Sequence, residues 1–551
     1  MAELVINQYQ YKKETGFDIF EDYLFPKLQL ASWKMHGPFA LKVGENIYLG
    51  GRFHERGYHQ GRVIPTNMKP IYIRPYFLFE PQPEKAYPDL ASAITELADK
   101  ELVVDYDIPV AFYTQLLGKI ELKFKPNSPQ INSRILEQPV DAVEKLLNNS
   151  YHAAAKLAEE IMEDKKIPQI SSLSKFMERS FPSRFAVLDR YMGENDIQAI
   201  IATSPLNVQE LAAVPQRTNE GGILAMYIKG GDEVIILHTD ELKELRKGRS
   251  GILNAPQFLS LVPDGVIGVE DEDMGMGQLI GLGLDSKKVK FASTLLRDWR
   301  EEIAGADLPF YILCALSTSH AIERALGEAE HRYREDWFVT EEDIFAFFKA
   351  SVDSFKNKYG IPFSHEIYFA NLHSGNRSES PSSYKPGYQL TAANNSIKYD
   401  TGIKMYDSYG FLRGVSDLAR TLCFNEAGQT VYEYLEKVQL EQGIPAAVPG
   451  ATGEDVYLAA CRGVDKYLDD IKQKNLVPAS IIHLEDVYSR DVGHTMGKEE
   501  PANLCFKKGE KAQFKVGMIC CFELQWGYRG HGFGIEDSFV ITEEGPVIFS
   551  R

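Results

Sequence analysis

The chain has 551 residues, too many for one ordinary hydrophobic core, and we expect three domains. Its 44% hydrophobic and 25% charged residues are typical of folded soluble proteins and exclude a disordered chain. The 78 acidic residues outnumber the 60 basic ones, and the net charge of -18 should repel both nucleic acid and anionic membrane headgroups. We therefore expect neither as a partner.

The sequence shows no sign of export. Residues 1–8 lack the basic and apolar regions of a signal peptide, and no segment approaches the ~18 unbroken apolar residues of a membrane span. The six cysteines have no CxxC spacing, so we interpret them as small buried residues in a reduced compartment. These features predict a cytoplasmic protein.

The first 180 residues predict a domain whose role the sequence does not indicate. Short aromatic strands, such as residues 71–79, are followed by a helical stretch from about Val140 to Asp164, with apolar residues at 3–4 spacing. From 181 to 300 the pattern changes to an α/β domain. A helix at 185–192 precedes a buried strand at 199–202, and 223–228 pairs with 233–238 as a hairpin.

Residues 301–551 form the third predicted domain. Long helices are expected at 296–306 and 314–335, and residues 340–343 have the pattern of a capping box that begins another helix. After about residue 375 the chain becomes rich in strands. The predicted fold class is therefore multidomain α/β and α+β.

Acidic residues and a histidine interrupt the apolar strands of the third domain at four places, the last of them a hairpin that carries two glutamates. Burying a carboxylate in a sheet is costly unless a metal ion or a partner compensates its charge. Four carboxylates and one imidazole suit two divalent cations about 3.5–4 Å apart, with Mn, Fe, Co or Zn as the candidate ions. The predicted ligands are Asp400, Asp417, His494, Glu523 and Glu536.

The order of these fragments resembles the creatinase, aminopeptidase P, prolidase and methionine aminopeptidase superfamily, which has the pita-bread fold. The shared motifs are Asp-x-Gly at 400–402, Ser-Asp-x-x-Arg-Thr at 416–421, Gly-His-x-x-Gly at 493–497, and the glutamate segments that end at 523 and 536. The likeness covers about residues 184–551. It implies a creatinase-like α/β domain at 181–300, a catalytic pita-bread domain at 301–551, and a homodimer.

The resemblance also implies a role for each ligand. Asp417 and Glu536 bridge two metal ions, Asp400 chelates one of them, and His494 with Glu523 completes the other. A metal-bound hydroxide is then the nucleophile, and Glu523 moves the proton. His494 and Glu523 are thus the predicted catalytic residues.

Two features depart from the family pattern. The separation of 17 between Asp400 and Asp417 is longer than usual, and Asp407 within this loop is a competing ligand; we favour Asp400 because it has the Asp-x-Gly context. In addition, the two histidines that hold the scissile amide in the peptidases are not found where expected. Serine takes the first position within 374–384, the run 498–501 has no imidazole, and the nearby alternatives are His373, His483 and His531.

These observations leave three hypotheses for the function. The first is a metal-dependent hydrolase of a C–N amide bond, acting on Xaa-Pro peptides or on a small specialised amide. The second is a non-hydrolytic metalloenzyme of the same fold, such as a lyase, and the loss of the amide-holding histidines motivates it. The third is a non-catalytic binding module, which the retention of all five ligands disfavours. A small molecule or short peptide is the expected substrate.

Overall fold

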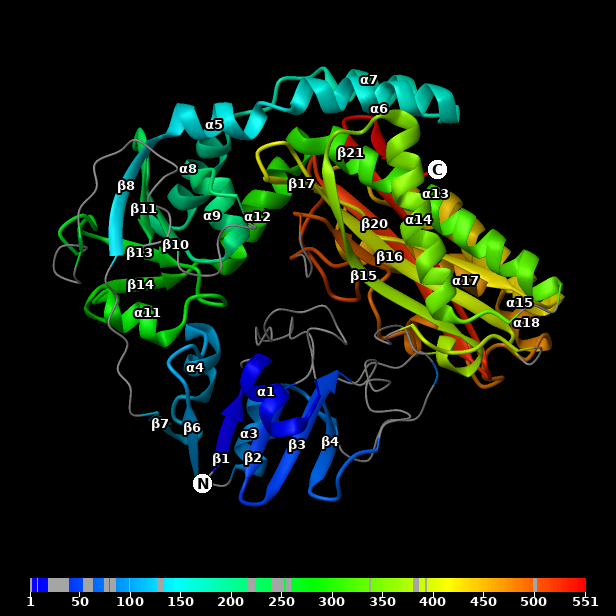
Figure 1. The fold of residues 1–551 in the computed structure, drawn as a ribbon, viewed down its shortest axis with the longest axis horizontal. Coiled ribbons are helices and arrows are strands. Elements are labelled where there is room, and N and C mark those ends of the chain that lie inside the picture. Colours follow the sequence, from blue (N-terminus) through cyan, green and yellow to red (C-terminus); the bar gives the residue numbers. More distant parts are fainter. Residues whose placement is uncertain are drawn as a thin grey trace.

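The structure is a computed structural model that describes all residues except 1, 7, 18–38, 53–62, 74–78, 80–85, 99, 126–132, 216–222, 239–251, 254–258, 336–337, 380–385, 392–393 and 499–502. The chain folds into three successive units that each contain helices and sheets, which we call the first, second and third layers (Figure 1). This arrangement confirms the predicted multidomain α/β and α+β fold class.

The first layer is a seven-stranded sheet in the order β5-β4-β3-β2-β1-β6-β7. Its core combines the inward residues of these strands with the apolar face of α3. Because strand side chains alternate between faces, β1 places both Ala2 and Leu4 in this core. The elements are β1 (Ala2–Val5), α1 (Gln8–Thr15), β2 (Phe39–Val43), β3 (Asn46–Arg52), β4 (Met68–Ile73), β5 (Ala86–Tyr87), α3 (Leu90–Leu97), β6 (Glu101–Val104), α4 (Val110–Leu116) and β7 (Glu121–Phe124).

The second layer is a seven-stranded sheet in the order β12-β8-β11-β10-β9-β13-β14, covered by helices. The predicted hairpin is confirmed, since β10 pairs antiparallel with β11. Ile201 of β9 packs towards the first layer, whereas its neighbour Ile200 faces α8 and α12. The elements are β8 (Ser133–Pro139), α5 (Val140–Asn148), α8 (Arg184–Glu194), β9 (Ile197–Ala202), α9 (Pro205–Ala212), β10 (Ile223–Ile228), β11 (Glu233–His238), β12 (Ile252–Leu253), β13 (Val266–Val269), α11 (Met276–Gly281), β14 (Lys288–Phe291) and α12 (Ser293–Ile303).

The segment 133–177 belongs to more than one layer. Its strand β8 joins the second sheet, and α5 packs on that sheet. The helices α6 (Tyr151–Lys165) and α7 (Ile170–Met177) pack instead in the core of the third layer, beside its longest helix. Residues 1–180 therefore contain the first sheet, one strand of the second, and a helical arm that reaches the third layer (Figure 1).

The third layer holds two four-stranded sheets that pack against each other through β16, β18 and β21. Helix α14 begins at the predicted capping box, in which Thr340 and Asp343 exchange hydrogen bonds. The elements are α13 (Leu308–Arg334), α14 (Glu341–Tyr359), β15 (Ser364–Ser374), β16 (Ser396–Tyr406), β17 (Leu412–Val415), β18 (Leu418–Cys423), α15 (Glu426–Val438), α17 (Gly453–Asp465), α18 (Leu468–Gln473), β19 (Gly493–Thr495), β20 (Ile519–Tyr528), β21 (His531–Thr542) and β22 (Gly545–Ile548).

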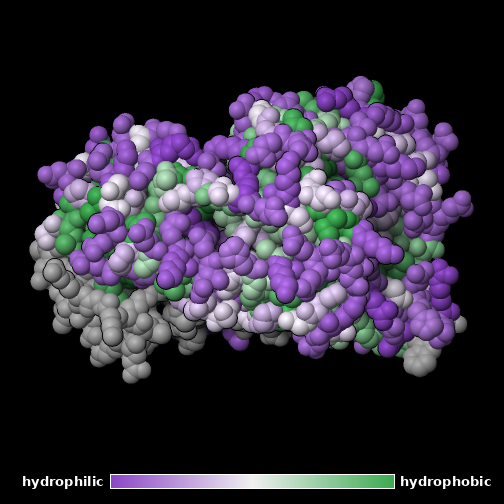
Figure 2. All heavy atoms as spheres, turned by 90° about the horizontal axis from the view of Figure 1, so that it is seen from above, coloured by the Kyte–Doolittle hydropathy of each residue, from purple (hydrophilic) through white to green (hydrophobic). Residues whose placement is uncertain are grey.

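The surface seen in Figure 2 is largely hydrophilic, and its apolar residues form small separate patches. Within the described part of the chain, none of the helices has both the length and the apolar character needed to cross a membrane.

A buried ionic cluster joins the second layer to the third. Three cations face three anions, and no side chain among them is more than 5% exposed. The Lys498 ammonium lies 2.7 Å from Glu210 and 2.6 Å from Asp307. The other ion pairs are Arg184 with Glu210 and Asp307, and Arg413 with Asp307 and Asp407.

We expect Arg413→Ala to lower the free energy of unfolding by about 3–5 kcal/mol, because removal of one partner leaves buried charge uncompensated. Chemical denaturation followed by circular dichroism measures this loss. Arg190→Ala is the control, since Arg190 forms half-exposed pairs with Glu194 and Glu302 and should change stability by about 1 kcal/mol or less. Equal effects of the two substitutions would contradict the prediction.

Candidate metal centre

The seam between the two sheets of the third layer gathers the predicted ligands. On β20, Cys521 and Glu523 lie two residues apart and therefore point to the same face. Their register partners share that face: His494 of β19 lies opposite Cys521, and Glu536 of β21 lies opposite Glu523. Antiparallel pairing thus brings side chains that are distant in sequence to one surface.

The Asp-x-Gly motif allows the segment around Ser416 to approach β16 closely. A Cβ atom on Gly402 would lie 1.8 Å from the carbonyl oxygen of Ser416, so only glycine permits this contact. The segment carrying Asp417 consequently lies against β16, where Asp400 is paired in register with Ala419. The motif therefore has a packing role in addition to supplying a carboxylate.

The Ser-Asp-x-x-Arg-Thr motif clamps the two sheets together. Arg420 donates to the carbonyl oxygen of Glu536 at 2.6 Å and to the Asp537 carboxylate at 2.8 Å. Thr421 donates to the Gly534 carbonyl at 3.0 Å and accepts from its N–H at 2.9 Å. These bonds fix the backbone on both sides of Glu536 relative to Asp417.

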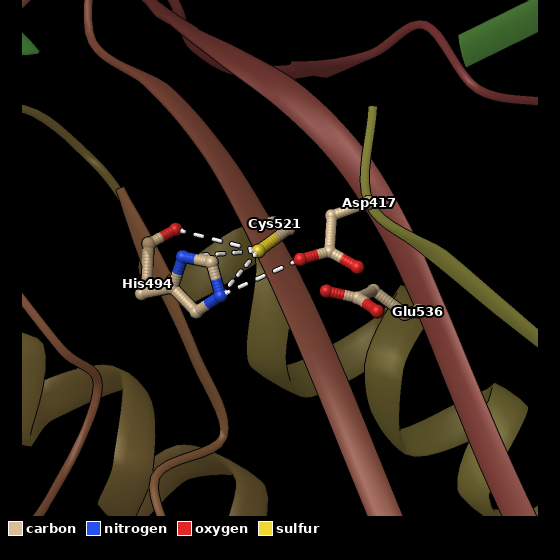
Figure 3. Close-up of side chains that lie close together, drawn as sticks. All are labelled: Asp417, His494, Cys521 and Glu536. Atoms are coloured by element: carbon tan, nitrogen blue, oxygen red, sulfur yellow. Dashed lines mark hydrogen bonds and ion pairs between the residues drawn. The ribbon is translucent and has the colours of Figure 1, made fainter. Parts of the chain in front are cut away.

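One group of four side chains has its ligand atoms within 4.8 Å of one another: Asp417, His494, Cys521 and Glu536. Figure 3 shows the carboxylates of Asp417 and Glu536 side by side, with the thiol of Cys521 between them and the imidazole. His494 Nε2 lies 3.8 Å from Asp417 Oδ2 and 3.4 Å from Cys521 Sγ. This group combines oxygen, nitrogen and sulfur donors.

A second group has ligand atoms equally close together and contains Asp400, Glu523 and Glu536. Burial, followed by the charge of Glu523, raises the pKa of Asp400 to about 7. Burial also raises the pKa of Glu536 well above its ordinary value, reinforced by Glu523 and Asp400. Asp400 Oδ1 is buried and accepts no hydrogen bond. Buried carboxylates packed this closely, one of them with an oxygen that accepts no hydrogen bond, suit a divalent metal ion.

Two cationic side chains border this second group. The Arg490 guanidinium donates to Glu523 Oε1. Lys398, two residues before Asp400 on β16, is fully buried, and burial lowers its pKa to about 7 against the opposing effects of Asp400 and Glu523. The amide Nε2 of Gln525 lies 3.3 Å from Glu523 Oε2 and 3.5 Å from Asp400 Oδ2.

Sequence reasoning did not identify Cys521, Lys398 or Arg490 as members of the site. The signal for two of them was period-2 alternation, since each lies two residues from a predicted ligand on the same strand. Arg490 lies outside any strand, so alternation gives no signal for it.

The competing ligand Asp407 lies outside both groups. Its carboxylate accepts from the backbone N–H groups of Tyr409 and Phe411 and pairs with Arg413 in the ionic cluster. Asp407 therefore shapes the turn between β16 and β17, while Asp400 lies among the predicted ligands.

The alternative histidines occupy different places. His483 is exposed beside Asp465, and His531 lies at the turn between β20 and β21. His373 is fully buried on β15, directly opposite Lys398 in the strand register, so it borders the second group. Ser374 donates to Glu341. Residues 380–384 of the predicted serine segment lie outside the described residues.

The family model for Metallopeptidase family M24 matches residues 315–543. The X-prolyl aminopeptidase from Caenorhabditis elegans, described as a cytosolic enzyme with a dinuclear active site, matches 98% of this chain and 83% of its own at 12% identity and a TM-score of 0.61. Xaa-Pro dipeptidase from Bacillus anthracis matches 67% of this chain and 97% of its own at 16% identity and a TM-score of 0.52.

The N-terminal domain of the FACT complex subunit SPT16 from Cicer arietinum matches 67% of this chain and 95% of its own, at 14% identity and a TM-score of 0.51. No curated protein matches the chain in sequence. At these identities the structural likeness establishes the fold, which is shared by peptidases and by a FACT subunit. The family resemblance seen in the motifs is confirmed.

We expect Asp417→Asn or Glu536→Gln to weaken metal binding by more than about 100-fold, because even loss of a residue that only supports a ligand costs 10–100-fold. Equilibrium dialysis with metal analysis measures the change. Asp407→Asn serves as the control and should leave metal affinity within a few-fold of the unchanged protein. Metal loss in Asp407→Asn with retention in Asp417→Asn would refute the assignment.

Proposed function

Residues 315–543 belong to metallopeptidase family M24, and on this basis we propose that the chain is a metal-dependent hydrolase of a C–N amide bond. The observation that carries the proposal is the convergence of the buried Asp417 and Glu536 with the partly buried His494 in one group on the family's fold. Short peptides of the Xaa-Pro type are the first substrate class to test, because solved structures with this fold include an X-prolyl aminopeptidase and an Xaa-Pro dipeptidase.

A bound metal ion and the side chains of the protein would supply different parts of the hydrolytic chemistry. A bound divalent ion polarises a substrate carbonyl and lowers the pKa of water. Asp417, His494 and Glu536 would hold that ion. Glu523 would hold and move the proton at its Oε2 atom, which accepts a long bond of 3.3 Å from Gln525, whereas Oε1 accepts from Arg490. The side chains of Asp417 and Glu523 are only 5% and 6% exposed, so bulk water is largely excluded around them.

A second candidate is a non-peptidase metalloenzyme of the same fold, such as a lyase that abstracts a proton beside a carboxylate. Lys398 and Arg490 favour it, because a fully buried lysine and a partly buried arginine near Asp400 and Glu523 give the site basic groups suited to an anionic substrate. The sequence run 498–501, which contains no histidine, favours it as well. A binding module without catalysis is a third class, and metal analysis separates it from the other two.

We expect the metal-loaded protein to cleave members of a panel of Xaa-Pro dipeptides and tripeptides, and to lose this activity on chelation. Amine release measured by mass spectrometry checks it. Asp417→Asn should abolish cleavage, whereas Asp353→Asn, on an exposed face of α14, should retain it. A metal-loaded protein that cleaves no peptide in the panel would refute the peptidase assignment and leave the lyase class.

A further inference from the structure

His494 is carried by a hairpin that approaches the other ligands from the edge of a sheet. The backbone of residues 492–495 is hydrogen-bonded to that of residues 504–506 on the other side of the hairpin. Strand β19 has only three residues and lies at the edge of its sheet, whereas Glu523 and Glu536 lie on the long inner strands β20 and β21. Pairing within the sheet therefore holds His494 less firmly than it holds the two glutamates.

The segment that joins the two sides of the hairpin rests on helix α12 of the second layer. Near the start of this segment, Arg300 Nη1 donates to the Gly497 carbonyl oxygen at 3.1 Å. At its end, the Asn503 N–H donates to Glu301 Oε1 at 2.7 Å. A Cβ atom on Gly497 would lie 3.3 Å from Glu301 Cγ, so the hairpin packs closely on the helix. The hairpin thus has a support outside its own sheet.

The side chain of Asn503 binds α12 through both ends of its amide. Its Nδ2 donates to the Thr294 carbonyl oxygen at 2.7 Å and to Asp298 Oδ1 at 2.8 Å. Its Oδ1 accepts from Arg297 Nε at 2.7 Å. Both N–H donors and the oxygen of the amide are therefore engaged. Residues 294, 297 and 298 are three to four positions apart, so they share one face of the helix.

Arg297 is itself held from within the second layer. Its Nη1 and Nη2 atoms donate to the two carboxylate oxygens of Glu272 at 2.5 and 2.8 Å. A bidentate pair of this kind fixes the plane of the guanidinium, and here it leaves Nε directed at Asn503. The Glu272 N–H donates in turn to Ser293 Oγ at 2.9 Å, at the first residue of α12. Asn503 therefore binds a surface whose geometry is already fixed.

We propose that Asn503 and Arg297 are positioning residues for His494. They hold the hairpin on α12 and thereby fix the imidazole relative to the carboxylates of Asp417 and Glu536. The proposal rests on the metal site of the proposed function and goes beyond it by giving α12 a part in metal affinity. Neither residue belongs to a candidate ligand group, so each acts through the hairpin. Loss of a residue that supports a metal ligand typically weakens metal binding 10–100-fold.

A double-mutant cycle with His494 tests this role. In the full-length protein, Asn503→Ala should weaken Zn²⁺ binding about 10–100-fold, measured by equilibrium dialysis. In the His494→Ala protein the same substitution should change Zn²⁺ affinity by less than about twofold, because a residue that acts only through the imidazole has nothing left to position. A loss of the same size in both backgrounds, or unchanged affinity in Asn503→Ala alone, would overturn the proposal.

Arg297→Ala is the second variant and should weaken Zn²⁺ binding to a similar extent. Arg190→Ala is its matched control, because Arg190 also binds a glutamate of α12, Glu302, but extends from α8. The control should keep Zn²⁺ affinity within a few-fold of the unchanged protein, and equal losses in the two arginine variants would overturn the proposal. This pair decides the question if His494→Ala leaves no measurable binding.

These measurements do not depend on peptide cleavage. A protein that follows the cycle but cleaves no peptide refutes only the hydrolase function, whereas an unchanged protein that binds no Zn²⁺ overturns both proposals.

Discussion

The burial of four carboxylates at one seam is the constraint on which the third layer depends. Asp400, Asp417, Glu523 and Glu536 are each at most 6% exposed, and in a low-dielectric interior their mutual repulsion requires compensating positive charge. The chain meets part of this requirement itself with Lys398 and Arg490. The remaining part lies around Asp417 and Glu536, where the imidazole and the thiol also converge.

The second constraint is the buried ionic cluster, which holds the two sheets of the third layer against the second layer. Lys498 lies four residues after His494, and its ammonium ends among Glu210 and Asp307 in the buried ionic cluster. Arg413, on β17 four residues before Asp417, belongs to the same cluster. The segments that carry Asp417 and His494 are therefore anchored to the second layer. The described part of that layer contributes to the geometry of the site, although none of its residues belongs to either candidate ligand group.

The bonds that join the two sheets and the side chains that face the seam have separate roles. The clamp made by Arg420 and Thr421 fixes β21 relative to β18, and this is backbone geometry that any bound ion would need. The side chains that face the seam include a lysine, an arginine and a cysteine beside the four carboxylates. Lys398 and Cys521 lie at strand positions whose direction the register determines. Arg490 reaches Glu523 from outside the strands.

The sequence by itself determined the elements and the order of the candidate ligands, because strand alternation, capping and motif order are local properties. The hairpin of β10 and β11, the cap of α14 and the ordered acidic motifs could all be predicted in this way. Only the tertiary structure decided that Asp407 pairs with Arg413, that Lys398 and Arg490 border Asp400 and Glu523, and that the arm 151–177 packs on the third layer. Those facts depend on which charges meet across distant segments, and a single chain pattern does not encode distances in space.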